Sequence, residues 1–392
     1  MISFENTEIA FQSKSDKDLN RAYWLFKVVA SKSMVKFGKL GVKVAFATHL
    51  PVNGIIKKTI FKQFCGGESI LDCASTIKHL NDFNIGTILD YSVEGKTSAE
   101  DFEATTNEII KTIEAGKNNP AIPFAVFKVT GISRFGILEA ANAGIESLTE
   151  SESKEYNEVV ERINRICKHA FESDVPVFID AEETWIQDTI DRIAFQMMLK
   201  YNQKKPIVYN TVQMYRHDRL DFLKKVIGLA KAEGINYGIK LVRGAYMEKE
   251  RDRAIEKRYP SPIQPDKASC DRDFDQAIEL IIDNLDICAL CSGSHNENSA
   301  NHLAQLIEKK QIDKTNKRIF FAQLLGMSDH ISYNLSHLNY NVAKYVPYGP
   351  IKEVMPYLLR RADENTSVAG QTGRELSLIM KELNRRKKKK TA

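Results

Sequence analysis

The chain places charged side chains at the ends of short apolar runs, where an enzyme built on parallel strands would hold its reactive groups. Lys128 ends the run FAVFK and Asp180 ends VFID, while Lys240 and Arg243 crowd the segment GIKLVRGAY. Cations can contact phosphates, carboxylates or an electron-rich ring, and a lysine can also act as a nucleophile. These four residues are therefore the first candidates for a functional site.

Two of these candidates leave several kinds of chemistry open. An unpaired ammonium at Lys128 would be costly inside an apolar run. It could reach solvent along its stem, form a Schiff base, or contact the charge of a substrate or cofactor. Asp180 is followed by Glu182 and Glu183. This carboxylate-rich segment could supply a site acid, hold a metal ion or cap the next helix.

Small and polar residues follow two other runs. Gly244 and Ala245 would let a flat or bulky group approach the backbone. The turn Ser294-His295-Asn296 precedes a helix-like stretch. Backbone N–H groups and short polar side chains at the start of a helix suit a phosphate.

Two further signals are weaker. Gln213 falls on the same face of its run as Thr211, but a single glutamine says little. Cys288 and Cys291 form a C-x-x-C pattern. A zinc site would need a second pair of ligands, so we interpret these cysteines as core residues.

Adjacent arginines near the C-terminal end suggest a carboxylate clamp. Arg360 and Arg361 could bind a small carboxylate in bidentate fashion. Tyr357 precedes them, and Glu364 is spaced to orient either guanidinium. Pro356 predicts a kink in this helix or a late start to it.

The order of the runs indicates the fold. Eight strand-like runs, each followed by a helix-like stretch, predict a parallel sheet with helices outside it. Eight such units over about residues 86 to 368 have the size of a (β/α)₈ barrel. An open doubly wound sheet is the alternative, but neither of the usual Gly-rich phosphate loops is present. The predicted strands are 86–91, 124–129, 177–180, 207–211, 238–242, 287–291, 318–321 and 342–346.

We expect three parts along the chain. Residues 1–80 should form a helical region packed on the main body, residues 81–370 the barrel, and residues 371–392 a helix end with a basic tail. The apolar segment Val42–Leu50 is too short to span a membrane.

Composition limits the class of protein. The chain has 392 residues, of which 43% are hydrophobic and 27% charged. These are the proportions of a globular domain with a sizeable core. Six cysteines are too few for a disulfide scaffold, and no stretch of 18 apolar residues occurs. The acidic first 18 residues lack an apolar region, so we expect neither a signal nor a transit peptide.

The charge is concentrated at one end. The net charge is +5, and the six cations of residues 385–390 exceed it, leaving −1 for the rest of the chain. A basic run of this kind is typical of a solvated, disordered end. It could also bind an anionic membrane surface or nucleic acid. The nearly neutral body argues against a nucleic-acid-binding protein.

With these features in view, the sequence resembles the proline dehydrogenase family, specifically its single-function enzymes. The segments that carry the resemblance occur in the family's order. The resemblance implies a (β/α)₈ barrel that binds FAD and no metal. It also implies oxidation of L-proline to Δ¹-pyrroline-5-carboxylate, with electrons passed to a membrane quinone. The matching segments are VFIDAEET (177–184), NTVQMYRHDR (210–219), KLVRGAYMEKERDRA (240–254), FFAQLLGMSDHIS (320–332) and YVPYGPIKEVMPYLLRRADENTS (345–367).

The resemblance also implies roles for individual residues. Asp180 and Lys240 match catalytic positions, with Asp180 organising the site and Lys240 near the reactive flavin nitrogen. The paired arginines would bind the proline carboxylate. The substrate-binding residues would be Lys128, Tyr246, Leu324, Tyr345, Tyr357, Arg360 and Arg361. The FAD-binding residues would be Ala181, Gln213, Arg243, Gly244, Ala245, Ser294, His295 and Glu364.

Some positions depart from the bifunctional relatives. This chain has Lys240 where they have arginine, Arg243 where they have lysine, and Met247 where they have a tryptophan that could stack on adenine. By the same resemblance, an aromatic residue at position 345 favours proline as the substrate. A hydroxyproline dehydrogenase is the alternative interpretation. A flavin-free barrel lyase using Lys128 is a third interpretation. We expect a cytoplasmic protein that contacts the inner face of the cytoplasmic membrane peripherally, and the basic tail would assist this contact.

Overall fold

The computed structural model describes most of the chain. It describes residues 2–31, 33–38, 52–93, 97–367 and 371–391, with the backbone alone at 53, 362–367, 371 and 372. The predicted feature Val42–Leu50 lies outside these residues. Within the described part, no helix is long and apolar enough to cross a membrane.

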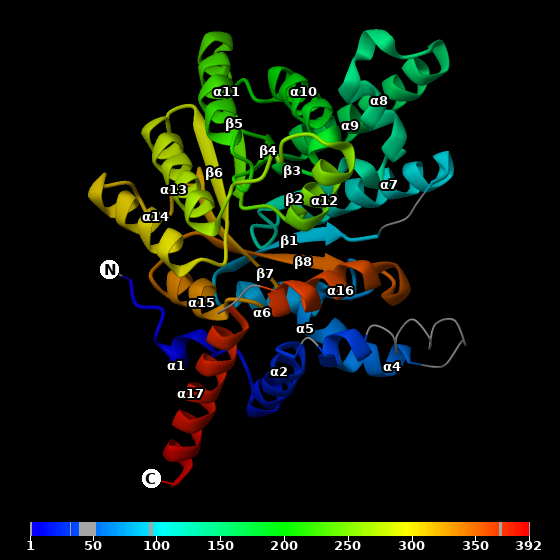
Figure 1. The fold of residues 1–392 in the computed structure, drawn as a ribbon. Helices are drawn as coiled ribbons and strands as arrows, with labels where there is room; N and C mark the ends of the chain where they lie inside the picture. Colours follow the sequence, from blue (N-terminus) through cyan, green and yellow to red (C-terminus); the bar gives the residue numbers. More distant parts are fainter. Residues whose placement is uncertain (1, 32, 39–51, 94–96, 368–370, 392) are drawn as a thin grey trace. The chain divides into compact units, whose positions relative to one another are not determined.

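Eight strands close into a barrel in the order β1 to β8, and neighbouring strands from β1 to β7 pair in parallel (Figure 1). The predicted barrel is confirmed, and the open sheet is wrong. Four strands (β4, β6, β7 and β8) continue beyond their predicted C-terminal ends. The strands are β1 (Ile85–Tyr91), β2 (Phe124–Lys128), β3 (Val177–Asp180), β4 (Val208–Gln213), β5 (Tyr237–Val242), β6 (Cys288–Gly293), β7 (Ile319–Leu324) and β8 (Val342–Tyr348).

Helices follow the strands as the alternating pattern predicts. Polar residues start several of them, and Thr149 with Glu152 forms a complete capping box before α9. The barrel helices are α7 (Ala99–Gly116), α8 (Phe135–Ala143), α9 (Glu150–Ser173), α10 (Thr184–Tyr201), α11 (Arg219–Glu233), α12 (Met247–Lys257), α13 (Lys267–Asp283), α14 (Glu297–Lys309), α15 (Asp329–His337) and α16 (Ile351–Ser367). The helices nearer the termini are α1 (Thr7–Ala10), α2 (Asp16–Val29), α4 (Asn53–Ile56), the π-helical η1 (Lys57–Phe61), α5 (Lys62–Phe64), α6 (Ala74–Asn81) and α17 (Gln371–Thr391). Short 3₁₀ turns are η2 (Val129–Gly131) and η3 (Ile145–Ser147).

The chain divides into two compact units. The first, which we call the strand-end unit, contains Ile88–Tyr91 and Gly95–Ala322. The second, the terminal unit, contains Ile2–Thr87, Ser92–Glu94 and Gln323–Ala392. Both units combine segments that are distant in sequence. The predicted division near residues 80 and 370 therefore stays a prediction, and each unit is described by itself below.

In the strand-end unit, aromatic rings pack together near the N-terminal ends of the strands. Phe124 stacks on Phe178 with centroids 4.5 Å apart and meets Phe320 edge to face at 4.8 Å. Tyr209 packs on Phe178 at 5.2 Å. These rings come from the first residues of β2, β3, β4 and β7. Because β2 and β7 are not neighbouring strands, their rings can meet only inside the barrel. We call this group of rings the aromatic plug. The polar residues at the C-terminal ends of the strands therefore lie next to an apolar interior.

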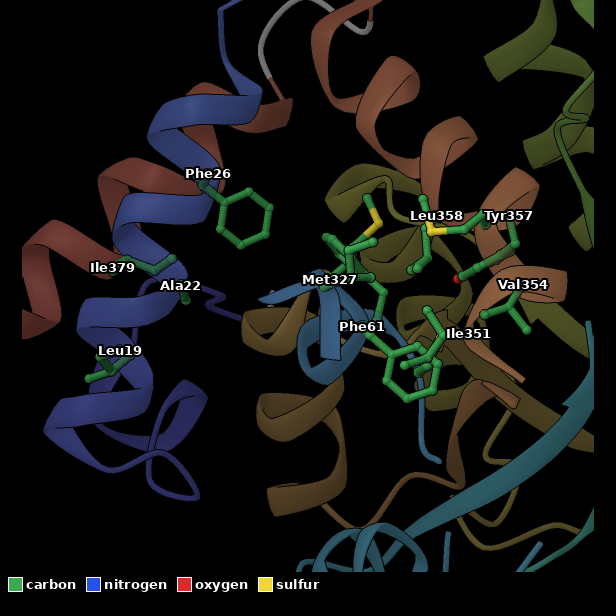
Figure 2. Packing of buried hydrophobic residues seen from close by; sticks show 14 of the residues in the cluster. Leu19, Ala22, Phe26, Phe61, Met327, Ile351, Val354, Tyr357, Leu358 and Ile379 are labelled. Carbon is green, nitrogen blue, oxygen red and sulfur yellow. The ribbon is translucent and has the colours of Figure 1, made fainter. Parts of the chain in front are cut away.

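In the terminal unit, N-terminal and C-terminal helices share one hydrophobic core (Figure 2). Phe26 of α2 is buried with Ile379 of α17, and Leu358 of α16 belongs to the same cluster. Helix α2 packs on both α16 and α17. The first helices are thus held by the C-terminal end of the chain.

The predicted disordered end is wrong for residues up to Thr391, because α17 extends to that residue. Arg386 donates to a side-chain oxygen of Asp16 at 2.9 Å and to Glu382 at 2.7 Å. Lys390 also contacts Asp16, at 2.5 Å. The local sequence pattern could not predict the pairs with Asp16, because that acid lies near the opposite terminus.

Candidate functional site

Lys240 and Asp180 form a buried ion pair at the ends of β5 and β3. The ammonium donates to Asp180 Oδ1 at 2.5 Å, and the hydroxyl of Thr211 donates to the same oxygen at 3.2 Å. Lys240 also lies 5.5 Å from the ring centre of Phe178, at the top of the aromatic plug. The two residues that sequence reasoning placed as catalytic are therefore in direct contact.

Lys128 belongs to the same group of strand ends. It is the last residue of β2 and pairs in register with Asp180, and its side chain is half-buried. Its charge also acts on the buried Glu182, whose pKa it lowers against the larger effect of burial. Lys128 therefore lies in the strand-end unit with Asp180 and Lys240, and all three carry charged side chains.

The three carboxylates at the end of β3 and directly after it contact different partners. Asp180 contacts Lys240, Glu182 contacts Thr130, and Glu183 contacts Lys249. Among the described residues, no three His, Cys, Asp or Glu side chains are placed to share a metal ion. Glu183 occupies the N-cap position of α10 without a side-chain capping bond. Neither the metal site nor the helix cap fits this arrangement.

Gln213 is the last residue of β4, and its side-chain oxygen accepts no hydrogen bond from the described residues. Its Nε2 donates to the carbonyl of Glu182 at 3.2 Å. Its Oε1 is buried and has no hydrogen-bond partner in the described part of the chain. Ala181 is buried directly after β3 and precedes Glu182 in the chain. A bound group with an N–H would satisfy the buried oxygen.

Arg243 is tied to helices beyond its own strand. Its guanidinium donates to Asp271 at 2.7 Å, to Ser294 at 2.7 Å and to Ser299 at 2.9 Å. Its charge is therefore already balanced by a carboxylate of α13. Arg243 positions the start of α14 and is less available to a phosphate than the sequence suggested.

The turn after β6 does open a helix, as predicted. Ser294 is buried, His295 is half-buried, and α14 begins at Glu297. Asn296 caps α14, and its side chain accepts from the N–H groups of Asn298 and Ser299. The serine hydroxyl accepts from Arg243, so this turn is fixed by the arginine.

The segment after β5 exposes backbone. Gly244 has φ +129°, and a Cβ there would come 2.5 Å from the Tyr215 ring. Gly244 and Ala245 are exposed, and Tyr246 is half-buried at the N-cap of α12. Only glycine fits this close approach without strain. Residues 244 and 245 thus leave backbone accessible directly after β5.

The terminal unit carries the other candidate residues. Tyr345 of β8 is 9% exposed, and its carbonyl accepts from Leu325 N at 2.9 Å. Leu324, at the end of β7, is half-buried against the hydrophobic core of this unit. This hydrogen bond joins Tyr345 of β8 to the residue that follows Leu324 in the chain.

Helix α16 places aromatic and guanidinium groups together. The guanidinium of Arg361 lies 5.1 Å from the ring centre of Tyr357, and both residues are buried. Arg360 is half-buried. The helix begins at Ile351 and continues through Pro356, so the predicted late start is wrong. The side chain of Glu364 lies outside the described residues.

Sequence reasoning missed the partners that hold these candidates. Thr130 binds Glu182, and Asp271 and Ser299 bind Arg243. None of them stands near its partner in the sequence or carries a motif. Cys288 and Cys291 are fully buried free thiols in β6, which confirms their interpretation as core residues.

With this geometry established, comparison with known proteins identifies the family. A family model for proline dehydrogenase matches residues 73–374. The chain is 33% identical to Proline dehydrogenase 1, mitochondrial, of Dictyostelium discoideum, covering 97% of this chain and 74% of that protein. It is 30% identical to Hydroxyproline dehydrogenase of Xenopus laevis, covering 98% and 90%. The chain belongs to the proline dehydrogenase family, a family of oxidoreductases that oxidise proline.

Solved structures agree on the fold. Proline utilization A from Bdellovibrio bacteriovorus matches with a TM-score of 0.72 at 20% identity, over 92% of this chain and 38% of that chain. Proline utilization A from Bradyrhizobium japonicum matches with a TM-score of 0.64 at 20% identity, over 79% of this chain and 31% of that chain. The family leaves the flavin-free lyase and the nucleic-acid-binding protein without support.

Proposed function

We propose that this chain catalyses the FAD-dependent oxidation of L-proline to Δ¹-pyrroline-5-carboxylate, the first step of proline catabolism. The observation that carries the proposal is the buried Lys240–Asp180 pair, which lies among strand-end residues in a chain of this family. When bound, FAD would supply the hydride acceptor and the route by which electrons reach a membrane quinone. The predicted barrel, residues 81–370, would hold both cofactor and substrate.

The strand-end cations would prepare the substrate amine. At neutral pH the ring nitrogen of free proline carries a proton, and its lone pair must be available before the imine can form. A cation near an amine lowers the pKa of that amine. Lys128 and Lys240 would supply this effect, and Asp180 would hold Lys240 in place through the bond to Oδ1.

The paired arginines would bind the substrate carboxylate. Arg360 and Arg361 offer planar donors for a bidentate contact. Tyr345 and Tyr357 would wall the ring, with Tyr246 and Leu324 as further contacts. The buried setting of Arg361 supports this role, since a guanidinium that is 8% exposed binds an anion with little competition from water.

Residues of the strand-end unit would hold FAD. Gln213 Oε1 would accept an N–H from the isoalloxazine ring, and the open backbone at Gly244 and Ala245 would admit it. Ala181, Arg243, Ser294 and His295 would line the rest, with Glu364 as a further contact. Because Arg243 is paired with Asp271, we assign it to holding the turn before α14.

Hydroxyproline is the second candidate substrate. A hydroxyproline dehydrogenase aligns with 98% of this chain. Tyr345 favours plain proline, because an aromatic ring against the substrate ring leaves less room for a hydroxyl.

An absorption spectrum tests cofactor, substrate and reaction together. Purified protein should show oxidised-flavin bands that bleach when L-proline is added without oxygen, and bleach less with hydroxyproline. Bands that respond to hydroxyproline alone would change the substrate. A colourless protein that does not take up FAD would contradict the proposal.

A substrate without a carboxylate tests the arginine contact. Pyrrolidine, which lacks the carboxylate, should react poorly, and the Arg361→Ala variant should lose the preference for proline over pyrrolidine.

Electron transfer to a membrane quinone implies contact with a membrane surface. Lys387, Lys388 and Lys389 are exposed on α17, and Trp24 of α2, which packs on α17, is 60% exposed. A basic and aromatic surface of this kind binds anionic lipid. We place this contact at the inner face of the cytoplasmic membrane. Cosedimentation with anionic vesicles should fall when the three lysines are changed to alanine, and unchanged binding would contradict this contact.

A further inference from the structure

Glu182 is buried within the strand-end unit and binds one residue at two points. It is 3% exposed and follows β3 by two residues. Its Oε1 accepts from Thr130 N at 3.0 Å, and its second oxygen accepts from the hydroxyl of Thr130. Thr130 lies in η2, the turn that directly follows Lys128. The carboxylate therefore clamps the turn that begins at a candidate substrate-binding residue.

The backbone of Glu182 holds a second candidate residue. Its carbonyl accepts from Gln213 Nε2 at 3.2 Å, the contact that turns Gln213 Oε1 toward its buried position. Its N–H donates to Gln187 of α10 at 2.8 Å. Gln187 in turn donates to Asp191 at 2.8 Å. Glu182 thus links the ends of β2, β3 and β4 to the first turns of α10.

The surroundings of Glu182 favour a proton near neutral pH. Burial and, to a smaller extent, the charge of the neighbouring Glu183 raise its pKa from 4.5 to about 7. The positive charge of Lys128 and the two contacts from Thr130 oppose this rise. Lys128 and Glu183 are the charged groups that act on Glu182, and Glu183 is itself paired with Lys249.

We propose that Glu182 is a positioning residue of the candidate site: its carboxylate fixes the turn after Lys128, and its carbonyl fixes Gln213. This inference rests on the proposed function, which supplies the roles of Lys128 and Gln213. Loss of a proton at Glu182 places a negative charge beside Lys128 and strengthens the clamp on Thr130. Protonation removes that charge and weakens the hold on Lys128.

Two variants separate the charge from the clamp. In Glu182→Gln, the amide keeps one acceptor for Thr130 N and one group for its hydroxyl, while the charge is gone. In Thr130→Val, the charge stays and the hydroxyl contact is lost. Both should raise KM for proline by roughly 10-fold to 100-fold, the size expected when a contact group is misplaced, with a smaller change in kcat.

The pH profile distinguishes the two variants further. In the wild type, kcat/KM should fall as the pH drops through about 7, the value to which burial raises the pKa of Glu182. Glu182→Gln should lose this limb and resemble the protonated wild type at every pH. Thr130→Val should keep it. A Glu182→Gln profile that retains the limb, together with an unchanged KM, would overturn the proposal.

The chain offers a matched control in Glu250. This carboxylate of α12 is also buried and also binds one threonine twice, accepting from Thr184 N and from its hydroxyl, both at 2.7 Å. Thr184 is the first residue of α10 and, unlike Thr130, does not closely follow a candidate substrate-binding residue. Glu250→Gln and Thr184→Val should therefore reproduce any general loss of stability, without the change in KM or in the limb near pH 7.

A readout that needs no substrate separates this proposal from the proposed function. Amide hydrogen exchange across residues 124–134 should be faster in Thr130→Val and Glu182→Gln than in the wild type or Glu250→Gln. If flavin is never reduced by proline, the proposed function fails while the exchange data still report the clamp. Unchanged exchange in both variants would overturn the clamp even in an active enzyme.

Discussion

Two buried lysines on barrel strands show how the strand-end unit and the terminal unit use the same residue type differently. Lys240 of β5 pairs with Asp180, and Lys344 of β8 pairs with Asp329 at 2.9 Å. Both lysines stand inside short apolar stretches of similar appearance in the sequence, GIKLV and VAKYV. Their surroundings differ, and the difference separates a candidate site from a structural anchor.

Lys344 is enclosed by groups that hold the fold of the terminal unit. Besides Asp329, its ammonium donates to the carbonyls of Met327 at 2.6 Å and Leu324 at 3.4 Å. Asp329 also forms an ion pair with Lys14 at 3.1 Å. Asp329 therefore joins the N-terminal segment to β8 and to the turn that follows β7. Burial lowers the pKa of Lys344.

Lys240 contacts side chains of the strand-end unit. It meets one carboxylate oxygen and lies over an aromatic ring, next to other polar strand ends. Lys344 binds main-chain carbonyls, which fixes a turn, whereas Lys240 binds the side-chain carboxylate of Asp180, which lies beside Lys128 in the register of the strands. The identity of the partners therefore indicates function better than burial or charge does.

The largest expected effect is on the stability of the terminal unit. Lys344→Met should lower the free energy of unfolding by about 3–5 kcal/mol, because Asp329 would keep only one of its two cations and two carbonyls would lose their donor. Lys57→Met is the control, since its pair with Glu68 lies at the surface and should contribute little to stability. Urea unfolding measures both. Equal small losses would mean that the cluster around Asp329 does not anchor the unit.

The next prediction uses two buried carboxyls with opposite pKa shifts. Burial raises the pKa of Glu182 to about 7 from 4.5, so the folded state binds its proton more tightly than the unfolded chain does. Stability should therefore fall as the pH rises from about 4.5 to 7, by on the order of 3 kcal/mol. Glu182→Gln should remove that fall. Unfolding curves measured across this pH window test it, and an identical slope in the variant would contradict the assignment.

Asp329 provides the opposite trend. Burial alone would raise its pKa, but Lys14 and Lys344 hold it below the ordinary value of 3.8. The stabilisation from Asp329 is thus complete above about pH 4 and is lost as the pH falls further. Asp329→Asn should lose less stability than the wild type between pH 4 and 2, as measured by thermal unfolding. A parallel loss in both proteins would exclude Asp329 as the source.

The smallest expected effect concerns the C-terminal helix. Arg386 contacts Asp16, Glu382 and the carbonyls of Phe11 and Lys14, whereas its neighbour Lys387 is exposed. Arg386→Ala should cost about 1 kcal/mol of unfolding free energy, and Lys387→Ala at most about 0.5 kcal/mol. Differential scanning calorimetry resolves this difference as a shift in melting temperature. Equal shifts would show that the ion pairs of α17 contribute nothing measurable.

The local pattern predicted the strands well, because each barrel strand is an apolar run followed by an amphipathic helix. It also brought Lys128, Asp180 and Lys240 into one group, since parallel strands end at the same edge. What it could not supply were partners distant in sequence. Arg243 finds Asp271 on a later helix, and Lys14 finds Asp329 near the opposite end of the chain.

The same limitation explains the error at the C-terminus. A run of cations resembles a solvated tail when its acidic partners are out of view. Asp16 lies more than 300 residues from Arg386, so only the folded chain reveals the pair. Glu182 was visible as one of three adjacent carboxylates, but nothing nearby indicated that Thr130 would clamp it.

The most direct test of the account compares the two lysines in the reaction itself. The rate of flavin reduction by L-proline would be measured by anaerobic rapid mixing in the wild type, Lys240→Met and Lys344→Met, each expressed per bound flavin. We predict a rate about 100-fold lower in Lys240→Met, because an electrostatic contact at the reacting groups is lost, and a rate close to wild type in folded Lys344→Met. Equal rates in the wild type and Lys240→Met would contradict the assignment of the Lys240–Asp180 pair to the site.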